Sequence, residues 1–127
     1  MTKNTGSFDI AAGTTLSGTT ETLNDTNTGT VETGATLTSG TKNPVVTFGS
    51  GTTSLTNSGI ISSTGDRALD ASGLAAGSNI TVTNNAGAEI LGLFKATGAS
   101  GKIVLTAGAP GLADGSINFT PAPRPTQ

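Results

Sequence analysis

Two short phrases recur in the same order in the middle of this chain. Leu55-Thr56-Asn57 returns 27 residues later as Val82-Thr83-Asn84, and Leu69-Asp70-Ala71-Ser72-Gly73 returns 25 residues later as Phe94-Lys95-Ala96-Thr97-Gly98. Repeats of this length indicate stacked units, each too small to bury its apolar side without a neighbour like itself. The repeat therefore favours a stack of similar coils over a globular domain with one thick core.

The composition supports a thin core shared along a stack. The 127 residues include 19 Gly, only 3% aromatic residues and 11% charged residues, so few side chains are large enough to fill a wide interior. Abundant Gly, Ser and Thr are also typical of flexible segments. The low charge and runs of β-forming residues such as Val45-Val46-Thr47-Phe48 favour the ordered alternative.

Short β-prone segments are separated by clusters of Gly, Asn, Ser and Asp, and no apolar pattern persists at helical spacing. The sequence therefore predicts an all-β fold without a substantial helix. The predicted strands are 7–10, 14–16, 30–31, 35–38, 45–48, 54–56, 60–62, 68–71, 80–83, 89–91, 93–96, 102–106 and 116–120.

Aligning the copies predicts about three short strands per coil, in a right-handed parallel β-helix. We expect one solenoid domain over residues 1–120, with its best-defined repeats at 50–106, followed by an extended Pro-rich tail at 121–127. Side chains alternate in and out along a strand, and sharp corners favour Gly and Asn. The predicted inner columns contain Leu55, Ile80, Val82, Ile103 and Leu105, and the predicted coil corners contain Asn57, Gly59, Gly73, Asn84, Gly87 and Gly98.

Asn57 and Asn84 fall at equivalent corners in this alignment, and a third partial copy replaces the Asn with Ala107. Two interpretations are compatible with this placement. Asn suits a turn because its side chain bonds to nearby backbone, and Asn amides in register can stack into a ladder between coils.

The refrain over residues 50–106 resembles the passenger domains of bacterial autotransporters. The resemblance is carried by the stretches 55–62, 67–73 and 80–90, which look like the passenger refrain of strand, Asn, Gly, Ile and then Ala-Ile-Asp. It implies a β-helix displayed at the bacterial cell surface or secreted. It also implies that this chain is a mature piece, or a fragment lacking its export signal.

The residues that usually perform catalysis are scarce. Without His or Cys the chain has no imidazole base, no thiolate and no disulfide, so we expect neither a cofactor nor a metal site. Parallel β-helices can host carboxylate-based polysaccharide enzymes, and Asp66 and Asp70 near Glu89 are the carboxylates to compare with the two-carboxylate geometry of such enzymes. The lack of Tyr and Trp argues against a sugar-binding groove.

The predicted function is therefore a non-catalytic structural and adhesive module. Its expected partner is a host or neighbouring-cell surface, either protein or glycan. A net charge of −2 with six Lys and Arg argues against nucleic acid, and no apolar run is long enough to span a membrane. The first alternative is a self-assembling fibre subunit that stacks end to end, and the second is a polysaccharide-acting enzyme.

Overall fold

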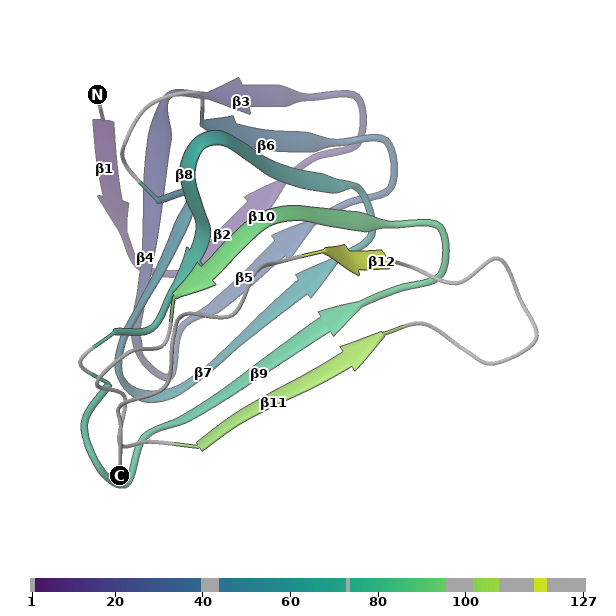
Figure 1. The fold of residues 1–127 in the computed structure, drawn as a ribbon. Coiled ribbons are helices and arrows are strands. Elements are labelled where there is room, and N and C mark those ends of the chain that lie inside the picture. The colour runs from purple at the N-terminus through teal and green to yellow at the C-terminus, as the bar shows by residue number, and fades with distance from the viewer. Residues whose placement is uncertain (1, 40–43, 73, 96–101, 108–115, 119–127) are drawn as a thin grey trace.

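The computed structural model describes residues 2–39, 44–72, 74–95, 102–107 and 116–118. Twelve strands and no helix occur in these residues, and every strand pairing among them is parallel. The chain winds as a right-handed parallel β-helix with three faces, which confirms the fold predicted from the repeat (Figure 1).

Each face is a ladder of strands contributed by successive coils. Face 1 contains β1 (Thr2–Thr5), β4 (Thr19–Asp25), the first part of β7 (Val46–Asn57) and the final parts of β8 (Ile60–Asp70) and β10 (Glu89–Lys95). Face 2 contains β2 (Phe8–Ile10), β5 (Thr28–Val31), the second part of β7, β9 (Asn79–Asn84) and β11 (Lys102–Ala107). Face 3 contains β3 (Thr15–Ser17), β6 (Thr36–Ser39), the first parts of β8 and β10, and β12 (Ser116–Asn118).

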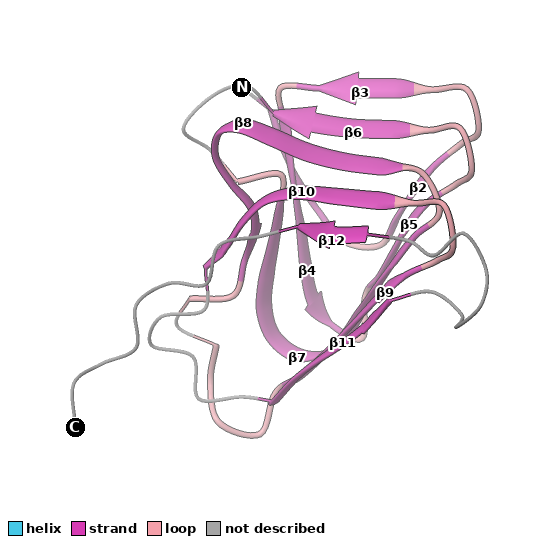
Figure 2. Cartoon of the chain, turned by 45° about the vertical axis from the view of Figure 1, so that its right-hand side comes forward, coloured by secondary structure: helices cyan, strands magenta, loops and turns pink. Residues whose placement is uncertain are grey.

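Figure 2 shows the strands of face 3 lying one below another, from β3 through β6, β8 and β10 to β12. Backbone hydrogen bonds join each coil to the next across corners as well as along the faces. The amide of Ile60 donates to the carbonyl of Ala35 at 3.0 Å, and the amide of Glu89 donates to the carbonyl of Gly59 at 3.0 Å. The described strands therefore form one continuous stack from Thr2 to Asn118.

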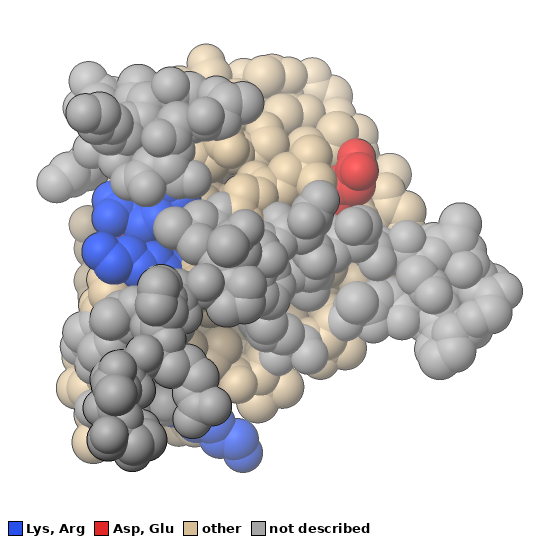
Figure 3. Space-filling view, viewed as in Figure 1, with Lys and Arg blue, Asp and Glu red and all other residues tan. Residues whose placement is uncertain are grey.

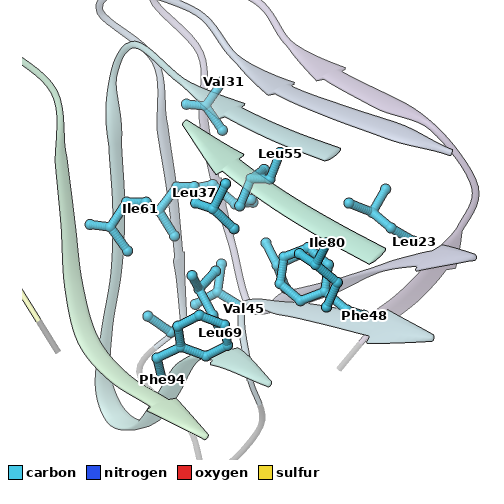
Figure 4. Close-up of a cluster of buried hydrophobic side chains, with 14 of the residues drawn as sticks. Leu23, Val31, Leu37, Val45, Phe48, Leu55, Ile61, Leu69, Ile80 and Phe94 are labelled. Atoms are coloured by element: carbon cyan, nitrogen blue, oxygen red, sulfur yellow. The ribbon is translucent and has the colours of Figure 1, made fainter. Parts of the chain in front are cut away.

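The core is a set of aliphatic columns inside the coil. On face 3 the successive partners Leu16, Leu37, Ile61 and Ile90 share one register, and the last three are fully buried. Burial of each large aliphatic side chain is worth about 1.5–3 kcal/mol, so these columns supply much of the attraction between coils (Figure 4).

In the first coils a glycine makes room for a large aromatic ring. Gly29 pairs with Phe8, and a Cβ atom on Gly29 would lie within 2.5 Å of the Phe8 ring, so only Gly leaves room for that ring.

On face 1 a buried Glu21 occupies the column that continues as Val46, Leu69 and Phe94. This charged position in the core was not predicted from the sequence.

Most strands lie where the sequence predicts them, with two kinds of difference. Pairs of predicted strands such as 45–48 and 54–56 are joined into single long strands that bend from one face to the next, as in β7 and β8. The strands β1 and β4 were missed. In β4 the residues Thr-Thr-Glu-Thr-Leu-Asn-Asp are nearly all polar, and Leu23 alone carries an apolar side chain.

Candidate functional site: the asparagine corner

The corner between faces 2 and 3 is where the predicted Asn and Gly positions gather. The chain leaves face 2 at four residues that are register partners, Ile10, Val31, Asn57 and Asn84. In three coils a four-residue turn follows, with the fourth amide donating to the first carbonyl at 2.9–3.0 Å. The third residue of each turn is a Gly with positive φ, namely Gly13, Gly34 and Gly87 at +81°, +84° and +82°. Type II turns require this conformation at that position.

The coil that contains Asn57 takes a shorter route. Only Ser58 and Gly59 separate Asn57 from Ile60, whereas four residues separate Asn84 from Glu89, the register partner of Ile60. A Cβ atom on Gly59 would lie 2.2 Å from the Ala35 carbonyl oxygen and 2.6 Å from that of Glu32. Gly59 is therefore required because the backbone of the preceding coil lies against it.

The Asn57 side chain compensates for the missing turn. Its amide nitrogen donates to the carbonyl oxygens of Gly59 at 3.2 Å and Glu89 at 2.9 Å. Its Oδ1 accepts a hydrogen bond from the Gly59 amide at 3.2 Å. The side chain is fully buried, and buried polar groups that lack partners are costly. The amide thus occupies the place that a backbone turn fills in the other coils.

Asn57 and Asn84 form the predicted ladder. Nδ2 of Asn57 donates to Oδ1 of Asn84 at 2.8 Å, and both side chains are 0% exposed. Nδ2 of Asn84 donates in turn to the Ala88 carbonyl at 3.0 Å. Val31 precedes the ladder and Ala107 follows it in the same register, so the ladder has two rungs in the described part of the chain.

The predicted corner glycines do not form one set. Gly59 directly precedes Ile60, whereas Gly87 lies two residues before Glu89, the register partner of Ile60. Gly59 is required because a Cβ atom would collide with neighbouring backbone, whereas Gly87 is required because its φ is positive. The other two predicted corner residues, Gly73 and Gly98, lie outside the described residues.

The predicted inner columns occupy face 2. Leu55 and Val82 are register partners with no exposed surface, and Ile80 pairs with the half-buried Ile103. The backbone of Leu105 pairs with Val82, and its side chain lies outside the described part of the chain.

The carboxylates compared for catalysis lie on different faces. Asp70 ends β8 on face 1, where Oδ2 lies 3.3 Å from Nε of Arg67, and Oδ1 accepts hydrogen bonds from the Ser72 amide and hydroxyl. Glu89 begins β10 on face 3 and points to solvent. The side chain of Asp66 lies outside the described residues. The Asp70 carboxylate is thus engaged in an ion pair with Arg67 and in hydrogen bonds to Ser72 in the following turn.

Another carboxyl pair joins two coils at the edge of face 2. A hydrogen bond between the side chains of Asp9 and Glu32 raises the pKa of Glu32 above its ordinary value of 4.5, and charge repulsion from Asp9 adds to the effect. The described residues contain no group of three or more His, Cys, Asp or Glu side chains arranged to hold a metal ion. Figure 3 shows that acidic and basic side chains are sparse on the described surface facing the viewer.

Comparison of the chain with protein families, with curated proteins and with solved structures found no match. Among the described residues there is no helix with the length and apolar character needed to cross a membrane.

Proposed function

We propose that this chain is a non-catalytic structural and adhesive module of a bacterial surface-exposed or secreted protein, similar in plan to an autotransporter passenger. The observation that carries the proposal is the in-register pairing of successive coils, in which Leu55 stacks on Val82 and Asn57 on Asn84. Such a stack is a rigid spacer, because each coil is fixed to the next by backbone hydrogen bonds on three faces.

The distribution of polar groups supports a structural role. The buried amides of Asn57 and Asn84 are committed to one another and to backbone carbonyls, which leaves them no part in binding a ligand. On face 3 the inward column of Leu37, Ile61 and Ile90 is apolar and fully buried. The surfaces of the three faces are then the parts of this module that can contact another molecule or a cell.

Labelling of cells tests the location. An antibody raised against residues 1–127 is expected to label intact cells of the source organism, and an added protease should remove that labelling. Labelling that requires permeabilised cells would contradict surface display. The adhesive role is tested separately, by comparing the binding of beads coated with the chain, and of beads coated with an unrelated protein, to cells and to glycan arrays.

A second candidate function, a fibre subunit, is favoured by the open first coil. Within the described residues β1, β2 and β3 each pair with one strand only, so the other edge of each strand has no strand partner in this part of the chain. Phe8 and Leu16 are half-buried at this end of the core. Exposed edges of this kind promote pairing between chains.

Sedimentation over a range of concentrations distinguishes the fibre from the monomeric rod. A fibre subunit is expected to form longer oligomers as the concentration rises, and Leu16→Lys should prevent this by placing a charge at the open end. A constant monomer mass for the unmodified chain would rule out the fibre.

A further inference from the structure

The outward side of face 2 carries a regular array of small residues, which we call the threonine face. One column contains Thr30, Thr56, Thr83 and Thr106, which are successive register partners. The neighbouring column contains Thr28, Ser54, Thr81 and Val104, in the same register. Six of these eight outward residues are threonines, and all eight are partly or fully exposed.

The array is more regular than the other long face. The ladders that join β5, β7, β9 and β11 contain no register shift, whereas the ladders of face 1 shift between Leu23 and Asp25 and between Leu91 and Phe94. Adjacent strands lie about 4.7–4.9 Å apart, and alternate residues of one strand are separated by about 6.6 Å. The threonine face is therefore a two-dimensional grid with two fixed spacings.

The grid is also nearly flat. In Figure 1 the strands β5, β7, β9 and β11 run side by side, and in Figure 2 β9 and β11 are seen almost edge on, as strands of an untwisted sheet are. Flat parallel sheets are unusual and are maintained by stacking of identical layers. Here the stacked core of Leu55 and Val82 lies directly behind the array.

The chemistry of the grid suits ordered water. Each Thr presents a methyl group beside a hydroxyl group, and β-branching restricts the χ1 rotamer, so little side-chain freedom is lost on binding. The eight residues of the two columns include no charged residue. Asp9 lies beyond the end of the first column, in register with Thr30, and Lys102 lies outside the second column, in register with Asn79 and two residues before Val104. Charged side chains thus border the array and do not interrupt it.

We propose that the threonine face binds ice. Crystalline water is a ligand that repeats in two dimensions, as the rows of hydroxyl and methyl groups on this grid do. The methyl groups order the adjacent water, the hydroxyl groups hydrogen-bond to it, and the rigid sheet keeps every row in phase. This inference is independent of the cell-surface role proposed above, because the face is complete within one chain.

Partners of other kinds fit this surface poorly. Protein interfaces depend on aromatic and Arg anchors seated in pockets, and the two columns contain neither residue type. A sugar polymer normally requires aromatic side chains on which its rings stack. The described part of the threonine face presents small side chains at regular spacing, and such an array is suited to binding a ligand that is itself a regular lattice.

The test uses the full chain and ice itself. We expect the unmodified protein to shape growing ice crystals and to lower their growth temperature below their melting temperature. T56Y/T83Y places two bulky rings in the centre of the grid and should reduce this thermal hysteresis at least about tenfold, as disruption at the centre of a complementary interface does. T22Y/T47Y is the matched control on face 1, where the two threonines are also register partners, and should retain the activity within about twofold.

Folding is checked independently for each variant by circular dichroism and thermal melting. If T56Y/T83Y fails to fold, T81K supplies the same test, because Thr81 is exposed in the second column. Absence of hysteresis and ice shaping in the unmodified protein would overturn the proposal. Equal loss in the face 1 control would also overturn it, as would retention on insoluble chitin or cellulose without any effect on ice.

Discussion

Removal of the Asn57 side chain should destabilise the fold far more than removal of a comparable exposed amide. Asn57→Ala leaves the buried Asn84 Oδ1 and the Gly59 amide without the partner that they have now, at 2.8 Å and 3.2 Å. An orphaned buried polar group costs about 1–3 kcal/mol. The loss of these two hydrogen bonds and of the one to the Glu89 carbonyl gives an expected decrease of about 2–5 kcal/mol in the free energy of unfolding, after some relaxation of the corner.

Asn57→Asp keeps the shape and inverts one hydrogen-bonding group. A carboxylate oxygen would replace the Nδ2 donor and face the oxygens of Asn84 and Glu89, both of which accept hydrogen bonds from it now. We expect N57D to be less stable than N57A at neutral pH. N57D should recover stability as the pH falls, because a protonated carboxyl group can donate one of the lost hydrogen bonds.

Urea unfolding followed by far-ultraviolet circular dichroism measures these changes, since the chain has no Trp or Tyr to report by fluorescence. Asn79→Ala is the matched control on the same face. Asn79 is exposed, and its amide donates one long hydrogen bond of 3.4 Å to Gly77. The control should change stability by no more than about 0.5 kcal/mol. Loss of less than about 1 kcal/mol in N57A, or an N57D variant more stable than N57A at neutral pH, would refute the reasoning.

Three further predictions concern close packing and titration. Gly29→Ala should lower stability by about 1–3 kcal/mol, because its methyl group would overlap the Phe8 ring, and Phe8→Leu in the same chain should restore part of the loss in the same urea assay. Gly59→Ala should destabilise more than Gly87→Ala, because the first meets backbone oxygens at 2.2 Å and 2.6 Å while the second meets open space and suffers only from its φ of +82°; equal melting temperatures would contradict this. Glu32 binds its proton more tightly in the folded chain than in the unfolded chain, so the melting temperature should rise as the pH falls from above the raised pKa towards the ordinary value of 4.5, and Glu32→Gln should flatten that part of the profile.

The repeat in the sequence was sufficient to predict the fold and the alignment of its best-defined coils. The spacing of 27 residues from Leu55 to Val82 is also the register of the strand pairs, so one alignment places the inner column and the Asn corner together. Alternation along 80–83 indicates which side chains point inward. These inferences succeed because the alternation of side chains along a strand and the number of residues per coil can both be read from the sequence.

Other features depend on contacts that the sequence does not display. Gly59 and Gly87 look equivalent in the aligned sequence, but the shorter corner after Asn57 places Gly59 directly before Ile60, whereas Gly87 lies two residues before Glu89, the register partner of Ile60. The fit of Phe8 over Gly29 depends on the neighbouring coil, 21 residues away. Strand β4 was missed because a strand that pairs through its backbone on both sides tolerates many polar side chains.

The regular threonine face could also have been recognised in the sequence, once the coils were aligned. Thr56 and Thr83 belong to the phrases that define the repeat, and Thr30 and Thr106 extend the same column. The sequence does not show that the strand ladders of face 2 continue without a bulge. Because they do, the outward threonines of successive coils lie in a regular two-dimensional array.

The central claim is that each coil lies parallel to the next, with Thr56 directly beside Thr83. Because the chain contains no Cys, a pair of introduced cysteines reports this arrangement without background. Register partners lie within the Cα separation of about 4.4–6.8 Å that a disulfide spans, whereas residues two coils apart are separated by about twice the strand spacing.

The decisive measurement compares disulfide formation in Thr56→Cys/Thr83→Cys with that in Thr56→Cys/Thr106→Cys under the same mild oxidant, with monomers identified by mass. The stacked coil predicts rapid intramolecular cross-linking of the first pair, whose members are in register, and none in the second, whose members are one coil further apart. Failure of the first pair to cross-link, or equal cross-linking of both pairs, would contradict the parallel stack.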